Sequence, residues 1–159
     1  MSEQATATNT VEIERIFDAP VELVWQMWTN PEHFKNWYGP EGLQIPVAEM
    51  DARVGGKRFV GMEMGSTKMW FVGEYIEVVP NERLVYTDSF ADENGNKVDT
   101  GDEPSASTVT VILEDLGGRT KMTMTHANLP GGKGARNGAQ AGWSQSFDKM
   151  ATRLTDLAA

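Results

Sequence analysis

Residues 139–157, AQAGWSQSFDKMATRLTDL, decide the fold. Six apolar side chains recur there at steps of three and four residues: Ala139, Trp143, Phe147, Met150, Leu154 and Leu157. This spacing predicts one apolar face of an α-helix, with Gln145, Lys149 and Asp156 on other faces. A long amphipathic helix is not stable alone in water, because its apolar face must be buried against another element. We therefore expect the rest of the chain to supply a curved apolar partner.

The residues before this helix are rich in strand patterns. Runs of alternating apolar and polar residues, bounded by turn residues, predict strands over seven ranges: 11–17, 43–52, 57–64, 69–79, 83–90, 107–114 and 119–126. Pro46 is expected to break the second of these strands. Turns are expected at Gly55-Gly56, at Gly65, at Pro80-Asn81 and at residues 116–118.

Helices and loops are expected between these strands. One short helix is predicted from Pro20 to Trp28. A second follows a cap at Asn30 or Thr29 and includes Trp37, and Gly39-Pro40 ends it. Residues 92–104 are polar and are expected to be a mobile hairpin loop. Residues 129–135 contain several glycines and are expected to connect the last strand to the final helix.

This order of elements predicts an α+β fold. Strands that are apolar on one face suit a curved antiparallel sheet of about seven strands that is covered by helix on one side. At 159 residues the chain is long enough for one domain that buries roughly 70% of its unfolded surface. We assign that domain to residues 11–159 and expect residues 1–10 to be a disordered tail. The space between the sheet and the final helix is a candidate ligand cavity.

The composition excludes several classes of function. The formal net charge is -9, which disfavours nonspecific binding to nucleic acid and to anionic membranes. The chain has no cysteine, so disulfides, thiolate nucleophiles and cysteine metal sites are excluded. We find no secretory signal and no apolar run near the ~20 residues of a membrane span, and we expect a cytoplasmic protein.

Short motifs between residue 11 and the end of the chain resemble a known family. They are DAP at 18–20, WTNP at 28–31, WYGP at 37–40, DARVGG at 51–56, GEY at 73–75, PNERL at 80–84 and GW at 142–143. In this order and spacing they are similar to the activator-of-heat-shock-chaperone-ATPase-like family, within the START-like or SRPBCC superfamily.

The resemblance implies a helix-grip (START/Bet v-like) fold, in which a curved antiparallel sheet grips a long C-terminal helix around a cavity. Members of the superfamily bind lipids, hormones or polyketides, and a few are cyclases, aromatase-like enzymes or chaperone activators. For this chain the resemblance therefore implies a small apolar or amphipathic ligand, with a chaperone as a second candidate partner. It leaves both a monomer and a homodimer open.

Methionine and aromatic residues supply most of the candidate cavity lining, because methionine adapts to irregular ligands. The candidate ligand-binding residues are Phe34, Trp37, Arg58, Met62, Met64, Tyr75, Tyr86, Met122, Met124, His126, Trp143 and Phe147. Among these, Trp143 and Phe147 are expected to form the helical wall, and Phe34 and Trp37 to close the mouth. For any one of these residues, ordinary core packing is the alternative.

The polar candidates each have two interpretations. Arg58, on an inward face, either pairs with a ligand carboxylate or reaches solvent at the start of its strand. His126 is either a cavity donor or general base, or an ordinary hydrogen-bonded histidine, and His33 is expected to face solvent. Tyr75 and Tyr86 either donate into the cavity or pack with their hydroxyls at its rim.

We assign no catalytic residue, metal site or cofactor. The carboxylates Asp51, Glu63, Glu74 and Asp88 are scattered, and Asp51 is expected to form a structural ion pair with Arg53. Residues 131–134, GGKG, lack the spacing of a phosphate-binding loop. The sequence thus favours a small-molecule binding protein. The alternatives are a cyclase- or hydrolase-type enzyme that uses the same cavity, and an interaction module resembling chaperone ATPase activators.

Overall fold

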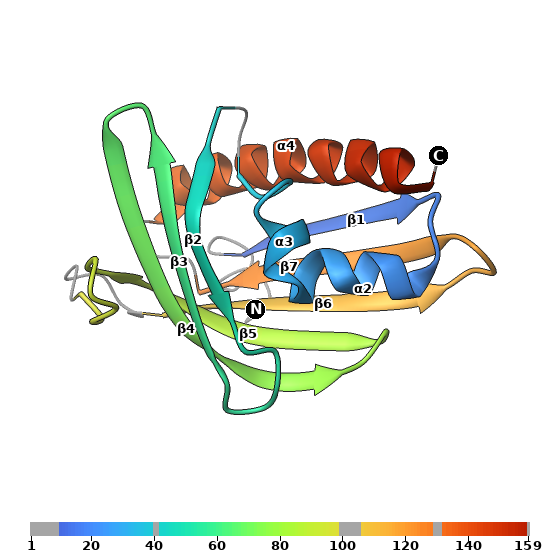
Figure 1. The fold of residues 1–159 in the computed structure, drawn as a ribbon, viewed down its shortest axis with the longest axis horizontal. Helices are drawn as coiled ribbons and strands as arrows, with labels where there is room; N and C mark the ends of the chain where they lie inside the picture. Colours follow the sequence, from blue (N-terminus) through green and yellow to red (C-terminus); the bar gives the residue numbers. More distant parts are fainter. Residues whose placement is uncertain (1–9, 40–41, 99–105, 129–131, 159) are drawn as a thin grey trace.

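The computed structural model describes residues 10–39, 42–98, 106–128 and 132–158 (Figure 1). Its elements, in chain order, are β1 (Val11–Phe17), α2 (Val21–Thr29), α3 (Pro31–Phe34), β2 (Gln44–Met50), β3 (Lys57–Met64), β4 (Thr67–Val79), β5 (Arg83–Ala91), β6 (Ser107–Asp115), β7 (Thr120–Ala127) and α4 (Gly132–Ala158). Residues 1–9 of the expected tail and residues 99–104 of the expected mobile loop lie outside the described residues.

The strands form one seven-stranded sheet in the order β1-β7-β6-β5-β4-β3-β2. Every neighbouring pair is antiparallel. Figure 1 shows that the sheet bends strongly, so that β2, β3 and β4 run across the direction of β1, β7 and β6, with α4 lying along the enclosed side. The predicted α+β helix-grip architecture is confirmed.

The two short helices follow their local sequence. Pro20 precedes α2, and the Asn30 side chain caps α3 by accepting a hydrogen bond of 2.9 Å from the backbone N–H of Glu32. Helix α3 ends at Phe34, three residues earlier than expected. Trp37 lies in the following turn, where its indole N–H donates to the carbonyl of Met27 at 2.8 Å.

Pro46 does not break the second strand, contrary to our expectation. Strand β2 is an edge strand of the sheet, and its pairing with β3 shifts register between Gln44 and Val47. A bulge at an edge is a position where the sheet tolerates the missing N–H of proline. The strand therefore continues through the proline instead of ending at it.

The final helix begins earlier than the sequence pattern indicates. Helix α4 starts at Gly132, so part of the expected 129–135 loop is helical, while residues 129–131 lie outside the described part of the chain. Trp143, Phe147, Met150 and Leu154 are buried as predicted. Leu157, in the last turn of α4, is 43% exposed instead.

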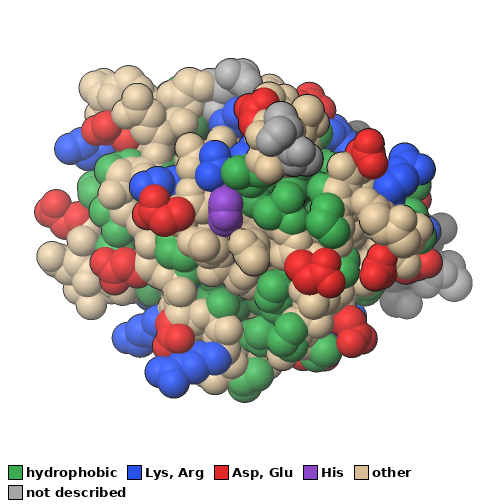
Figure 2. Space-filling view, turned by 45° about the vertical axis from the view of Figure 1, so that its right-hand side comes forward, with side chains coloured by type: hydrophobic (Ala, Val, Ile, Leu, Met, Phe, Trp, Pro, Cys, Tyr) green, Lys and Arg blue, Asp and Glu red, His purple; other side chains and the backbone are tan. Residues whose placement is uncertain are grey.

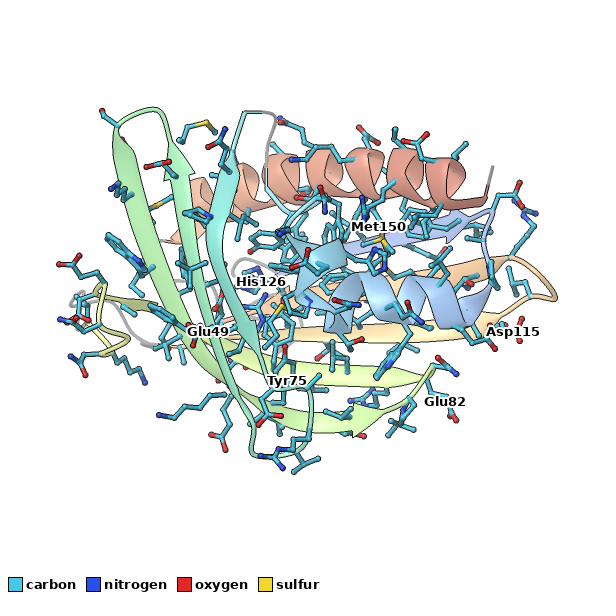
Figure 3. The ribbon with its side chains drawn as sticks, viewed as in Figure 1. Glu49, Tyr75, Glu82, Asp115, His126 and Met150 are labelled. Atoms are coloured by element: carbon cyan, nitrogen blue, oxygen red, sulfur yellow. The ribbon has the colours of Figure 1, made fainter. Side chains whose placement is uncertain are left out.

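Helix α4 is held on the sheet by apolar packing and by one ion pair. Its buried face joins a continuous core with residues of the inner sheet face and of α2. Figure 3 shows Met150 pointing from α4 toward the other elements, whereas Asp115 lies at the far loop end of the sheet. Arg15 of β1 contacts Asp148 of α4 at 2.8 Å, which ties the helix to the first strand.

Two motif glycines are required by close backbone approach. A Cβ atom at Gly73 would lie 1.8 Å from the carbonyl oxygen of Thr87, on the neighbouring strand β5. A Cβ atom at Gly56 would lie 2.0 Å from the carbonyl oxygen of Asp51. Glycine thus lets strands β4 and β5 approach closely, beside the position where β3 places Arg58 opposite Gly73. Asp51 and Arg53 form the expected ion pair, at 2.9 Å.

Replacement of Gly73 by alanine should destabilise the protein, because no backbone shift relieves the overlap with Thr87 cheaply. We expect a loss of about 1–3 kcal/mol or more of unfolding free energy in urea denaturation. The matched change Gly138→Ala should instead stabilise by about 1 kcal/mol, because Gly138 lies within α4 and a Cβ there meets nothing within 4 Å. Equal stability of the two variants would contradict the close-approach argument.

Candidate functional site

A hollow of about 530 Å³ lies between the sheet and the N-terminal half of α4. Its apolar lining comes mainly from the sheet side and includes Leu43, Met62, Met64, Met69, Phe71 and Phe90. The helix contributes Ala139, Gly142, Trp143 and Ser146, and the polar side chains of the lining include Asp88, Ser107 and His126. Met64, Met69 and Phe90 are each more than a third exposed, so the hollow opens to the surface beside the β3–β4 hairpin.

The twelve candidate residues separate into two groups. Met62, Met64, His126 and Trp143 line the hollow. The other eight are almost fully buried in the core and do not line it: Phe34, Trp37, Arg58, Tyr75, Tyr86, Met122, Met124 and Phe147. These eight side chains pack within the core, whereas the hollow stays open beside the N-terminal half of α4. A ligand role for the first group stays a prediction.

Phe34 and Trp37 do not close a mouth, contrary to our expectation. Their ring centroids lie 5.2 Å apart, and Trp37 packs against Trp28 at 4.8 Å. Both rings are fully buried. The aromatic side chains of Trp28, Phe34 and Trp37 therefore pack into the hydrophobic core and do not line the hollow. Tyr38 is the aromatic residue of this segment that reaches the hollow.

A chain of hydrogen bonds crosses the floor of the hollow from α4 to β5. The indole N–H of Trp143 donates to Nδ1 of His126 at 3.0 Å. The other ring nitrogen of His126 contacts Ser107 Oγ at 2.8 Å, and Ser107 Oγ donates to the backbone carbonyl of Asp88 at 3.2 Å. Figure 3 shows His126 pointing into the space between the sheet and the helices. Helix α4 is thus connected through β7 and β6 to β5.

The direction of this chain fixes the protonation state of His126. An indole N–H can only donate, so Nδ1 of His126 is the acceptor and the proton of the neutral ring lies on Nε2. Burial, and then the positive charge of Arg58, lower the pKa of His126 to about 4. His126 is therefore the ordinary hydrogen-bonded histidine of our two interpretations, and neither nitrogen is free to act as a general base at neutral pH.

Arg58 is buried, rather than reaching solvent, and has a partner within the protein. Its side chain is 2% exposed, and its Nη1 lies 3.4 Å from Oδ1 of Asp88. The guanidinium carbon lies 4.1 Å from the ring centroid of Tyr86 and 5.0 Å from that of Phe34. Burial raises the pKa of Asp88 to about 6, although Arg58 acts in the opposite direction. Asp88 therefore stands between Arg58 and the hollow.

Several polar atoms around Arg58 have no hydrogen-bond partner among the described residues. They are Nε and Nη2 of Arg58 and the hydroxyls of Tyr75 and Tyr86. The two tyrosine rings contact each other at 5.9 Å, and both hydroxyls are buried in the core instead of lying at the rim of the hollow. Tyr75 points inward in Figure 3. Neither interpretation of the tyrosines placed their hydroxyls there.

Asp88 and Ser107 are the polar residues that the choice of candidates missed. Asp88 appeared only among scattered carboxylates. It follows Leu84 and Tyr86 at steps of two on β5, so strand alternation places it on their inner face. A buried arginine on that face needs an acidic partner. The presence of both Arg58 and Asp88 on inner strand faces was therefore the signal in the sequence that could have identified Asp88 as that partner.

His33 lies outside the hollow. His33 is half-buried instead of facing solvent, and its Nδ1 accepts from Nε of Arg153 at 3.2 Å. No group of metal-binding side chains occurs among the residues that the structure describes. Figure 2 shows acidic and basic side chains interspersed around hydrophobic ones on one face. Within the described ranges, no helix is long and apolar enough to cross a membrane.

Comparisons with known proteins give one family. The family model described as "Activator of Hsp90 ATPase homolog 1-like protein" matches residues 18–155. A crystal structure of a protein from Chromobacterium violaceum is 31% identical, with a TM-score of 0.80 over 92% of this chain and 96% of that one. No curated protein matches the sequence.

Two further solved structures support the fold. A solution structure of a protein from Arthrobacter aurescens is 26% identical, with a TM-score of 0.78 over 94% of this chain and 88% of that one. A crystal structure from Silicibacter pomeroyi, whose description names the same family, is 23% identical, with a TM-score of 0.77 over 92% and 97%.

The pKa values of Asp88 and His126 should be reversed relative to their order in water. We expect the Asp88 carboxyl to titrate near pH 6 and the His126 imidazole near pH 4, because burial disfavours the charged form of each. Side-chain carbon and nitrogen chemical shifts followed by NMR measure both. A His126 titration near 6.5 would contradict the hydrogen-bond chain.

The same two groups should make opposite contributions to stability between about pH 4 and 6. The folded state holds an extra proton on Asp88 there, and the unfolded state holds one on His126, so the two slopes cancel. In Asp88→Asn, unfolding free energy should therefore rise with pH across this window relative to wild type. In His126→Asn it should fall with pH. Parallel curves for the three proteins would refute this assignment.

Proposed function

Because the chain belongs to the family of Activator of Hsp90 ATPase homolog 1-like proteins, we propose that it binds a small apolar or amphipathic molecule in the hollow between the sheet and α4. The single observation that carries the proposal is the hollow itself, which remains open where the rest of the core is filled. Its volume of about 530 Å³ falls within the roughly 300–1,000 Å³ that is usual for small-molecule sites.

The lining supports an apolar ligand. Met62, Met64 and Met69 present flexible, polarisable side chains to the hollow. Phe71 and Phe90 also line it, with tilted rings whose centroids lie 5.0 Å apart. Opposite them, Trp143 offers an indole that is held in place through its hydrogen bond to His126. An adaptable wall facing a rigid aromatic wall suits a ligand whose shape varies.

The described geometry favours binding over catalysis. An enzyme of the cyclase or hydrolase kind needs at least two polar groups that converge on the substrate. Of the polar candidates from the sequence, Arg58 and Tyr75 do not line the hollow, and His126 uses both ring nitrogens within the protein. A chaperone partner is supported only by the description of the family, and no contact in this structure adds to it.

Filling the hollow from the helix should abolish ligand binding without unfolding the protein. Gly142 lines the hollow, and a Cβ atom there meets nothing within 4 Å, so Gly142→Leu projects an apolar side chain into the open space. We expect binding of the neutral fluorophore N-phenyl-1-naphthylamine to fall at least 10-fold in a fluorescence titration. Leucine also favours helix over glycine, so stability should not fall.

The matched control is Gly138→Leu. Gly138 lies one turn earlier on α4, is exposed, and also has open space around its Cβ position, but it does not line the hollow. Its affinity for the fluorophore should equal that of the unchanged protein. Equal affinities for all three proteins, or no binding by any of them, would refute the proposed site.

A further inference from the structure

The polar groups of the hollow differ in how much hydrogen-bonding capacity they have left. The only donor of Trp143, its indole N–H, is already hydrogen-bonded to His126. Both ring nitrogens of His126 are hydrogen-bonded within the protein. Ser146 Oγ accepts from the backbone N–H of Gly39 at 2.7 Å and donates to the carbonyl of Gly142 at 2.9 Å. These three side chains therefore hold the wall together and have little to offer a ligand.

Asp88 differs from them because one of its oxygens is unused. Oδ1 pairs with Arg58, whereas Oδ2 has no hydrogen bond to any residue that the structure describes. The side chain is only 8% exposed, yet it lines the hollow. Oδ2 is not among the fully buried polar atoms that lack a partner, so it is reached from the hollow. A donor on a ligand in the hollow can therefore replace the water that hydrates this oxygen.

The remaining groups do not restrict the ligand in this way. Tyr38, Thr67 and Ser89, each of which carries a hydroxyl group, also line the hollow. A hydroxyl can either donate or accept, so it adapts to whichever group it meets. Asp88 only accepts when it is ionised. It is therefore the group that sets the polarity of the ligand.

Charge balance decides whether the donor should be an ion. Arg58 already neutralises Asp88, and none of the described lining residues is a lysine or an arginine. A ligand cation would be repelled by the buried positive charge of Arg58, which lies behind Asp88. A ligand anion would be repelled by the carboxylate of Asp88, which lines the hollow. Either ion would also lose its hydration on entering an apolar hollow. A neutral donor avoids both costs.

We propose that the hollow selects a neutral, largely apolar molecule that carries a hydroxyl group, which donates its hydrogen bond to Oδ2 of Asp88. The inference rests on the proposed function, since it names the chemical class of ligand for the same site. It differs from the sequence-based expectation that Arg58 would pair with a ligand carboxylate, because Asp88 occupies that place.

A matched set of naphthalene compounds tests the inference by isothermal titration calorimetry near neutral pH. The set is naphthalene, 2-naphthol, 2-naphthoate and the 2-naphthylmethylammonium ion, which share one ring system and differ in the polar group. We expect 2-naphthol to bind at least about 10-fold more tightly than each of the other three, because a hydrogen bond to a charged acceptor is among the stronger ones.

The outcomes separate the inference from the proposed function. Binding of naphthalene with no advantage for 2-naphthol overturns the inference and leaves the binding site standing. Tighter binding of the naphthoate or of the ammonium ion also overturns it. If none of the four compounds binds, the proposed function fails and the inference fails with it. The unchanged protein alone gives these answers, so they do not depend on the folding of any variant.

Substitution of Asp88 then assigns the preference to this residue. In Asp88→Asn the charge of Arg58 is no longer balanced, so 2-naphthoate should gain at least about 10-fold in affinity while 2-naphthol loses its advantage. Glu74→Gln is the control, since Glu74 is an exposed carboxylate on the adjacent strand β4. It should leave all four affinities unchanged. An unaltered order of affinities in a folded Asp88→Asn protein would contradict the role of Asp88.

Discussion

The buried charge of Arg58 is the constraint on which the rest of the structure depends. A guanidinium this deep in a core needs an acid, and Asp88 is the carboxylate that reaches it. From the backbone of Asp88 a hydrogen-bond chain continues through Ser107 and His126 to Trp143 on α4. The chain thus joins β3, β5, β6 and β7 to the helix. The position of the helical wall is therefore coupled to the buried charge of Arg58 on β3.

Much of the fold could be predicted because periodicity depends only on the order of residues. Steps of three and four identified the buried face of α4, and strand alternation identified the inner faces of β6 and β7. The exceptions have local physical causes. Strand β2 continues through Pro46 because it is an edge strand with a bulge. Leu157, which shares the periodicity of the buried face, lies in the last turn of α4 and is exposed.

The site was less predictable, since periodicity tells which side chains point inward but not which of them fill the interior. Trp37 was expected at the mouth, and the hydroxyl of Tyr86 in the cavity or at its rim. Both side chains instead pack in the buried core, while Met62 and Trp143 line the hollow. That division depends on where the sheet and α4 leave the hollow open, which the periodicity of the sequence does not describe. The role of Asp88 emerges only when its pairing with Arg58 is seen.

The central claim is that the hollow between the sheet and α4 is a ligand site, and a crystal structure of the protein grown with 2-naphthol tests it most directly. The account predicts the naphthalene ring between Met62 and Trp143, with its oxygen within hydrogen-bonding distance of Asp88 Oδ2. An empty hollow at saturating 2-naphthol, or the compound bound only at another surface, would contradict it.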